Sequence, residues 1–329
     1  IATEKVSFDD RGDLTLRVGS LEDGGADVFE FVVCSRALAR ASPVFRAMLF
    51  GGFSESKPEG DTWIVKLPED RPAPFFILLN IIHGRFRAVP QKLKLDELYQ
   101  LLVVTNKYDM LSVIFQWAPS WFEPFKTLEA SIEGNERLLW IAWELGDKGA
   151  FELMSRNLVL GSGIDNEGRL IDKKGVPLNT YDCYEATDIL DSITKARQNL
   201  VNDLNGLFHN AIRKALKNRG CIRKEKPKVS TSSQAVVGHS SPSDGRIPFL
   251  GQVIILWTRL SIMRPDYRVV HEECSPLAYI TARFEASING FSLPILENHL
   301  NYMRSQAGKT AIGGYGPAET GEPRTKKPK

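Results

Sequence analysis

Residues 29–56 read FEFVVCSRALARASPVFRAMLFGGFSES, and the hydrophobic pattern changes within them. Residues 28–33 are aromatic or β-branched, apart from Glu30, which favours a strand. After them the apolar residues follow a helical spacing. Ser42-Pro43 supplies a helix N-cap followed by a proline at the first helical position. We therefore expect a strand that leads directly into two short helices.

The segment from Cys34 to Arg40 has the C-x5-R spacing of the protein tyrosine phosphatases, which would make Cys34 a thiolate nucleophile. A phosphate-binding loop needs glycine at its tight positions, and the intervening residues are Ser, Arg, Ala, Leu and Ala. Ala-Leu-Ala favours a helix, and Val33 stands where those enzymes have His. We therefore expect Cys34 to end a strand and Ser35 to cap the following helix. Arg40 should then lie on the face of that helix.

The flanking segments complete a small α+β unit. Residues 13–18 and 62–67 have strand patterns, and apolar helices are expected over 74–82 and 93–108. The rest of the chain is mostly helical. Two helices should meet around the Gly146–Gly149 turn, and a long amphipathic helix should cover 186–217. Three shorter helices are expected at about 249–263, 276–288 and 294–305.

The composition of the 329-residue chain is that of an ordinary globular protein, with 43% hydrophobic and 25% charged residues. A net charge of +2 gives no global attraction to nucleic acid or to an acidic membrane. The four cysteines lie far apart, which favours a reducing compartment. We find neither an apolar run of about 18 residues nor a signal-peptide core. An intracellular location, cytoplasmic or nuclear or both, is expected, with no membrane partner.

Searches for catalytic and metal motifs give no enzyme prediction and no cofactor. The Gly51–Lys57 stretch lacks the second glycine of a Walker loop, and the sequence contains neither G-x-S-x-G nor H-E-x-x-H. His271 and Cys274 have a metal-like spacing, with His299 and Cys221 as further ligand candidates. A closed zinc site usually has two close pairs of ligands, and this chain has one. Whether these residues bind metal is left open.

The motifs around the opening stretch resemble those of the BTB/POZ domain. The apolar-x-x-x-S-x-x-F-x-x-M pattern and the following F-x-E element fall on Leu38, Ser42, Phe45, Met48 and Phe53-Ser54-Glu55. The family's first strand, third strand with the next helix, and closing helices are similar to DLTLRVG (13–19), VKLPEDRPAPFFILLNIIHG (65–84) and LDELYQLLVVTNKYDM (95–110). The motif WIAWELGD (140–147) is similar to the extension found in fungal BTB proteins.

The resemblance implies an α+β fold, with a small, mainly antiparallel sheet and helical hairpins followed by a mostly α-helical region. It divides the chain into a BTB/POZ domain over 8–115 and a helical extension over 116–221. A flexible linker is expected over 222–246, where large apolar residues are few. A C-terminal helical region over 247–306 and a disordered basic tail over 307–329 complete the expected organisation.

The resemblance also implies a non-enzymatic protein-protein interaction module, because BTB domains self-associate or bind the cullin scaffolds of ubiquitin ligases. In the narrower expectation the chain is a substrate adaptor, and the cullin contact uses an apolar-x-Glu element that Phe53 and Glu55 match. The candidate partner-binding residues are Phe53, Glu55, Met48 and Asp13. Homodimerisation is left open, because dimers in the family are built partly from a helix and a strand that precede Asp13.

The alternative hypothesis is a nuclear scaffold or regulatory protein with a BTB interaction domain and basic segments that serve for nucleic-acid binding or nuclear import. Residues 213–228 carry eight Lys or Arg against one Glu, and the tail adds a basic import segment. The residues of this import segment are Arg324, Lys326, Lys327 and Lys329. Because no aromatic residues alternate with these cations, direct nucleic-acid binding is not expected.

Overall fold

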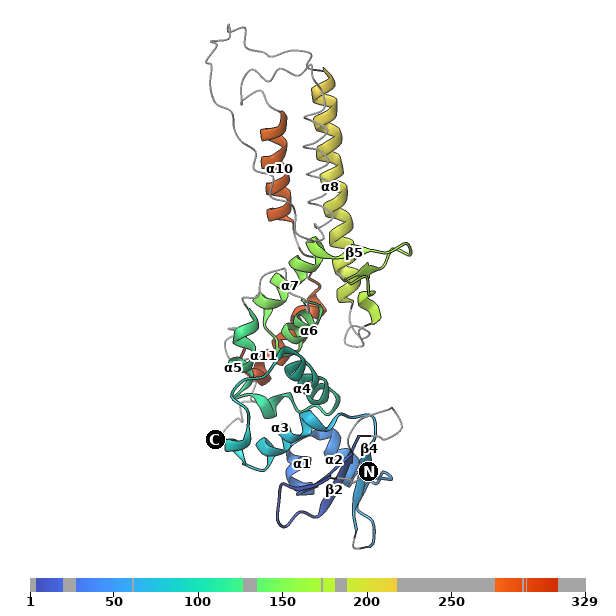
Figure 1. Ribbon diagram of the computed structural model, residues 1–329, viewed down its shortest axis with the longest axis vertical. Coiled ribbons are helices and arrows are strands. Elements are labelled where there is room, and N and C mark those ends of the chain that lie inside the picture. Colours follow the sequence, from blue (N-terminus) through green and yellow to red (C-terminus); the bar gives the residue numbers. More distant parts are fainter. Residues whose placement is uncertain are drawn as a thin grey trace, which may run out of the picture. The chain divides into compact units, whose positions relative to one another are not determined.

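The structure is a computed structural model that describes residues 4–19, 28–60, 62–126, 135–172, 174–180, 188–217, 276–291, 293 and 295–312. These residues form a mixed α+β structure that is mainly helical, as the sequence predicts (Figure 1). The chain divides into two compact units. Unit 1 comprises Ile1–Met154 and Glu297–Lys329, and unit 2 comprises Ser155–Leu296.

Unit 1 contains a four-stranded sheet in the order β1-β3-β2-β4. Its strands are β1 (Glu4–Ser7), β2 (Leu14–Val18), β3 (Phe29–Val33) and β4 (Ile64–Leu67). The β2–β3 pair is antiparallel, whereas β1 joins β3 and β4 joins β2 in parallel. The expectation of a mainly antiparallel sheet is therefore wrong. Hydrophobic alternation identifies a strand but not its direction, and the helices between β3 and β4 return the chain so that β4 runs parallel to β2.

The sheet presents its apolar residues to one core. Leu14, Leu16 and Val18 of β2 are buried, as their alternation predicts. Phe31 of β3 lies opposite Leu16 in the register, and its ring packs edge-on against Phe76 at a centroid distance of 4.9 Å. The three predicted strands are confirmed. The short and largely exposed β1 was not predicted, because four residues with one apolar side chain give no readable pattern.

The two short helices after β3 are α1 (Ser35–Ala41) and α2 (Pro43–Phe50). The hydroxyl of Ser42 accepts a hydrogen bond from the N–H of Phe45 at 2.9 Å, and Pro43 is the first residue of α2. Both features confirm the prediction from Ser42-Pro43. The same hydroxyl donates to the carbonyl of Tyr108, whose ring stacks on Phe45 at 4.4 Å. These contacts join the α1–α2 hairpin to a distant helix end.

Residues 72–126 of unit 1 are mostly helical. The helices are α3 (Pro72–Ile82), the short 3-10 helix η1 (Phe86–Ala88), α4 (Leu95–Lys107), η2 (Leu111–Ile114) and α5 (Ala118–Lys126). The α3 and α4 helices confirm the predicted helices at 74–82 and 93–108 within two residues at each end. Glu97 closes the first turn of α4 by accepting from the N–H of Lys94 at 2.8 Å. Tyr108 then donates to Asp70 at 2.6 Å, which ties the end of α4 to the turn before α3.

A helix from the end of the chain completes unit 1. The helices α6 (Asn135–Leu145) and α7 (Lys148–Gly161) confirm the predicted pair, and α11 (Glu297–Thr310) packs against α6 and η2. The predicted C-terminal boundary at residue 306 is too early, since α11 continues to Thr310. The hydroxyl of Thr310 is buried and donates to the carbonyl of Leu145 at 2.7 Å. The predicted tail therefore begins with helical, partly buried residues.

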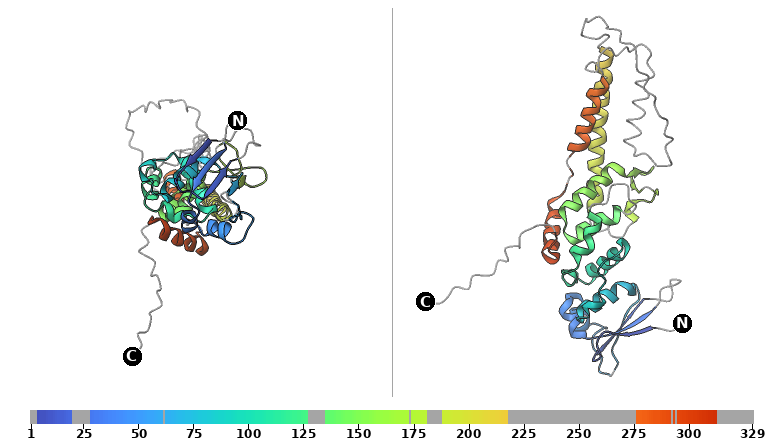
Figure 2. Two further views of the ribbon diagram at one scale, coloured as in Figure 1. Left: turned by 90° about the horizontal axis from the view of Figure 1, so that it is seen from below. Right: turned by 60° about the vertical axis from the view of Figure 1, so that its left-hand side comes forward.

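Unit 2 contains the short hairpin β5 (Gly163–Ile164) and β6 (Leu170–Ile171), the 3-10 helix η3 (Leu178–Thr180), and two longer helices. The long helix α8 (Ile189–Lys217) confirms the helix predicted at 186–217, and α10 (Pro276–Gly290) confirms the one predicted at 276–288. These two helices lie side by side (Figures 1 and 2). The buried residues of α8 recur at helical spacing, as in an amphipathic helix, and are Ile189, Ile193, Ala196, Arg197, Leu200 and Leu204.

Some predicted segments lie outside the described residues. They are the linker at 222–246, the helix at 249–263 and the tail from residue 313. Among the helices that the structure does describe, none has both the length and the apolar character needed to cross a membrane.

Candidate partner-binding surface

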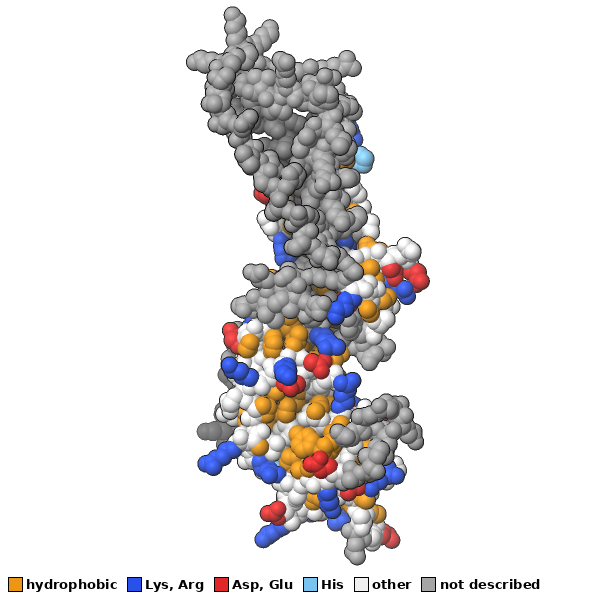
Figure 3. Space-filling model, in the orientation of Figure 1, with side chains coloured by type: hydrophobic (Ala, Val, Ile, Leu, Met, Phe, Trp, Pro, Cys, Tyr) orange, Lys and Arg blue, Asp and Glu red, His pale blue; other side chains and the backbone are white. Residues whose placement is uncertain are grey.

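The outer face of α2 and the loop that follows it expose large apolar side chains. Phe53 in the loop is 60% exposed, Phe50 is 50% exposed and Val44 is 37% exposed. The opposite face of the same helix buries Phe45 and Leu49 completely. Figure 3 shows that hydrophobic side chains also gather on the visible face of unit 1, with charged groups among them. An apolar face on a helix whose other side is already packed is a candidate contact surface for a protein partner.

Hydrogen bonds hold the loop at residues 51–56 in a fixed conformation. The hydroxyl of Ser56 accepts from the N–H of Gly52 at 3.1 Å and donates to the carbonyl of Met48 at 3.3 Å. The indole N–H of the buried Trp63 donates to the carbonyl of Glu55 at 2.8 Å. Gly52 has a φ of 81°, which a residue with a side chain rarely adopts. The exposed position of Phe53 is therefore imposed by an ordered turn.

Glu55 lies two residues after Phe53 in the same turn. Its side chain is half-exposed, and its carboxylate accepts a hydrogen bond from the hydroxyl of Ser54 at 2.7 Å. Among the described residues no Lys, Arg or His side chain forms an ion pair with Glu55. The loop therefore offers one aromatic ring and one uncompensated carboxylate, which together can supply an apolar anchor and a charge that sets the register.

Two other candidate residues have roles within the chain. Asp13 caps α1, because its two carboxylate oxygens accept from the N–H and the hydroxyl of Ser35 at 2.8 Å each. The N-cap position itself belongs to Cys34, so the prediction that Ser35 caps the helix is wrong. Burial would raise the pKa of Asp13, but the hydrogen bonds from Ser35 outweigh burial and hold this pKa below its ordinary value. Met48 is half-buried and contributes its carbonyl to the loop.

Cys34 lies directly before a helix and not in a phosphate-binding loop. Residues 35–41 form α1, which confirms the helix expected from Ala-Leu-Ala. The N–H of Cys34 donates to Nε2 of His83 at 3.1 Å. Because Nε2 accepts this bond, the ring proton of His83 lies on Nδ1 and is donated to the carbonyl of Leu79 at 2.9 Å. The thiol of Cys34 is half-buried, and Arg40 lies exposed on α1.

The metal and import candidates fall partly outside the described residues. His271 and Cys274 lie outside them, as do Arg324, Lys326, Lys327 and Lys329. His299 is buried in α11, where its ring packs edge-on against Trp143 at 5.1 Å. Within the described part of the chain, no cluster of three or more His, Cys, Asp or Glu side chains could hold a metal ion.

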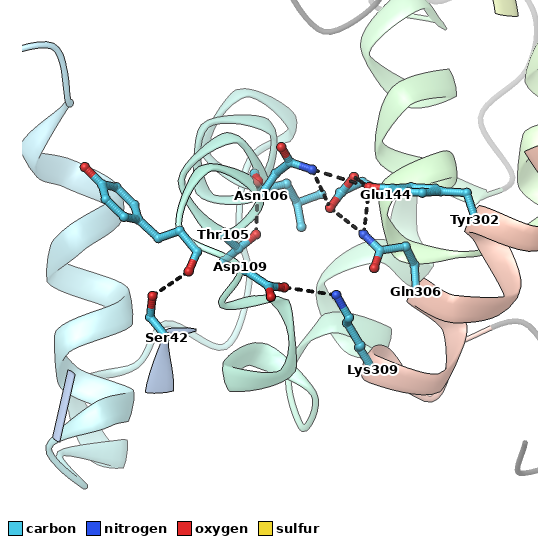
Figure 4. Close-up of polar contacts among 10 residues, drawn as sticks. Ser42, Thr105, Asn106, Asp109, Glu144, Tyr302, Gln306 and Lys309 are labelled. Atoms are coloured by element: carbon cyan, nitrogen blue, oxygen red, sulfur yellow. Dashed lines mark hydrogen bonds and ion pairs between the residues drawn. The ribbon is translucent and has the colours of Figure 1, made fainter. Parts of the chain in front are cut away.

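Sequence reasoning missed a buried polar network that joins α4, α6 and α11 (Figure 4). Glu144 on α6 is buried, with 1% of its surface exposed. Its carboxylate accepts hydrogen bonds from Tyr302 and Gln306 at 2.7 Å each and from Asn106 at 3.1 Å. Burial raises the pKa of Glu144 although these hydrogen bonds oppose the shift. A glutamate inside the apolar run WIAWEL was the one available signal, and it did not identify the partners.

Comparison of the chain with known proteins gives no assignment. The chain matches no protein-family model and no curated protein sequence.

Proposed function

We propose that this chain is a non-enzymatic protein-interaction module whose residues 8–115 form a BTB/POZ domain. We further propose that it acts as a substrate adaptor for a cullin-type ubiquitin ligase. The basis for the domain assignment is the set of motifs in the sequence, and the helical hairpin supports it. The second helix of the hairpin begins at the Ser42 cap and leads directly into the Phe53 loop.

The observation that carries this proposal is the exposure of Phe53 on an ordered loop. If Phe53 only closed the hairpin, its ring would be expected to pack into the core, as Phe45 does. Instead the ring is 60% exposed, while the backbone around it is anchored through Ser56 and Trp63. A rigid aromatic anchor loses little conformational freedom on binding, so it suits a compact hot spot.

The proposed contact uses three neighbouring features of this surface. The ring of Phe53 enters a pocket of the cullin N-terminal domain, and the carboxylate of Glu55 fixes the register by pairing with a donor beside that pocket. The exposed face of α2, with Val44 and Phe50, supplies the surrounding apolar contact. Asp13 is not part of this contact, because both of its carboxylate oxygens are engaged by Ser35.

The experiment is calorimetric binding of the full chain to a cullin N-terminal domain, with the double variant Phe53→Ala/Glu55→Ala beside the wild type. Because Phe53 is exposed and the Glu55 side chain bonds only to the exposed Ser54, the double variant should remain folded. Circular dichroism and a melting curve check that it does. The proposal requires binding by the wild type and a large loss in the folded variant.

A further inference from the structure

A second exposed aromatic side chain, Phe86, lies between two arginines in the connection from α3 to α4. Phe86 is 56% exposed, and Arg85 and Arg87 beside it are exposed as well. Residues 71–95 contain no Asp or Glu. They carry five basic residues, namely Arg71, Arg85, Arg87, Lys92 and Lys94. This part of the chain is therefore locally cationic although the net charge of the protein is close to zero.

The backbone around Phe86 is held firmly. Gly84 has a φ of 71°, and the N–H of Arg85 donates to the carbonyl of Asn80 at 2.7 Å. At the other end of the segment, the carbonyl of Pro90 accepts from the indole of the buried Trp121 at 2.9 Å. Since both ends are tied to helices, the exposure of Phe86 is a property of the folded unit and not of a loose loop.

Phe86 shares its surface with a tryptophan. The ring of Trp117, which is half-exposed, lies 5.7 Å from the ring of Phe86 between centroids, and the two planes are inclined by 41°. Trp117 in turn stacks on the buried Trp121 at 6.3 Å with an interplanar angle of 24°. The two outer rings form a small apolar surface backed by the core, which we call the Phe86 surface.

The cations of the segment that carries Phe86 have no carboxylate partners among the described residues. Arg87 and Lys92 form no ion pair there. Arg85 donates to the carbonyl of Ser7 at 2.8 Å and lies 5.5 Å from the ring of Phe8, so its charge also remains uncompensated by an acid. An exposed aromatic anchor with exposed, unpaired cations in the same short segment is complementary to an acidic ligand with an apolar side chain.

We propose that the Phe86 surface docks an acidic peptide segment of a protein partner. An apolar side chain of that segment would rest on Phe86 and Trp117, while flanking carboxylates pair with Arg87 and Lys92. The geometry favours a peptide over single-stranded nucleic acid, because the rings are inclined to each other and do not form a flat platform for consecutive bases. So few cations also neutralise few phosphates, which gives weak binding at moderate salt. This surface is distinct from the Phe53 loop and does not depend on the proposed cullin contact.

The test is selection of a phage-displayed library of random peptides, each about 16 residues long, against the immobilised full chain. We expect enrichment of peptides in which Asp and Glu flank an aromatic or aliphatic residue. Synthetic copies of the enriched peptides should bind the wild type at least about tenfold more tightly than they bind Phe86→Ala or Arg87→Glu. Binding should also weaken as salt is raised.

Matched variants separate this surface from the rest of the molecule. Phe53→Ala removes an equally exposed ring elsewhere, and Arg40→Glu reverses an exposed charge on α1, so both should retain peptide binding. Phe86→Ala should in turn leave cullin binding unchanged. The proposal would be overturned if acidic peptides are not enriched. It would also be overturned if the enriched peptides bind Phe86→Ala and Arg87→Glu as tightly as they bind the wild type. A third outcome is that the wild type retains single-stranded DNA at moderate salt, that Phe86→Ala does not, and that no acidic peptide binds. This outcome would assign the Phe86 surface to nucleic acid and would also overturn the proposal.

Discussion

The carboxylate of Asp13 holds the first turn of α1 from a position 22 residues earlier in the chain. Its two oxygens accept from the N–H and the hydroxyl of Ser35, each at 2.8 Å. A side chain directly before β2 thus performs the capping that is usually supplied by the residue before the helix. The bond joins the sheet to the α1–α2 hairpin, from which the Phe53 loop follows.

Asp13→Ala should destabilise the protein by about 1 kcal/mol, because α1 loses its cap. Urea unfolding at pH 7 measures this, and faster hydrogen exchange of the Ser35 amide localises it. The pKa of Asp13 is lowered in the folded state. Its contribution to the free energy of unfolding is therefore fully present above pH 3.8 and is lost as the pH falls through the lower pKa of the folded state. Asp10→Ala, at an exposed neighbour, should change neither quantity. A loss of cullin binding by folded Asp13→Ala would contradict a purely structural role for Asp13.

Gly146→Ala should destabilise unit 1 by about 3 kcal/mol, because both the backbone conformation and the space exclude a side chain. Gly146 has a φ of 78°, and a Cβ there would lie 2.4 Å from the backbone nitrogen of Ala307 on α11. Gly308→Ala is the matched control on α11 itself, where an added Cβ meets nothing within 4 Å. That substitution should be neutral or stabilise by up to about 1 kcal/mol. Equal effects of the two variants in urea unfolding would show that α11 does not pack closely on the end of α6.

Glu144→Gln should change how stability depends on pH. Burial raises the pKa of Glu144 above its ordinary value of 4.5, so the folded state holds this proton more tightly than the unfolded state. The stabilisation that comes from this tighter proton binding is fully present below pH 4.5. It is lost as the pH rises through the pKa of Glu144 in the folded state. The free energy of unfolding of the wild type relative to Glu144→Gln should therefore fall as the pH is raised above 4.5. Glu285→Gln, the same substitution at an exposed position, is the matched control in these measurements.

Ser56→Ala should weaken cullin binding without touching the proposed contact residues. The variant removes the hydrogen bonds to Gly52 and Met48, so the loop is less ordered in the free protein. Ordering the loop on binding then costs free energy, which lowers the affinity. We expect an affinity about three- to tenfold lower by calorimetry, and faster hydrogen exchange of the Gly52 amide. Ser54→Ala, whose hydroxyl bonds to the exposed Glu55 carboxylate, should bind like the wild type. Unchanged affinity of Ser56→Ala would mean that the ordered loop is not needed.

The sequence predicted the features that depend on neighbouring residues. Ser42-Pro43 indicates a helix start because both the cap and the proline act within one turn, and the structure confirms it. The alternation of Leu14, Leu16 and Val18 identifies β2 for the same reason. The resemblance to BTB/POZ motifs, and not local spacing, led to the prediction of an F-x-E element after the second short helix, and it did not predict the exposure of Phe53.

Contacts between distant residues could not be read in the same way. The Asp13–Ser35 cap replaced the expected local cap, because nothing in the Cys34-Ser35 pair shows that a carboxylate approaches from another strand. Glu144 and Gln306 are 162 positions apart, so the docking of α11 on α6 depends on tertiary packing. Strand direction failed as a prediction for a related reason, since it is set by the path of the connecting helices.

The proposed cullin contact is tested most sharply by calorimetric titration of a cullin N-terminal domain into the full chain and into Phe53→Ala/Glu55→Ala. We expect micromolar or tighter binding by the wild type and an affinity about 30-fold lower in the folded double variant, the loss expected for a hot spot of about 2 kcal/mol. Phe86→Ala/Glu4→Ala, which removes an exposed ring and an exposed carboxylate elsewhere on unit 1, should bind like the wild type. No binding by the folded wild type, or equal binding by the Phe53/Glu55 variant, would contradict the proposed contact.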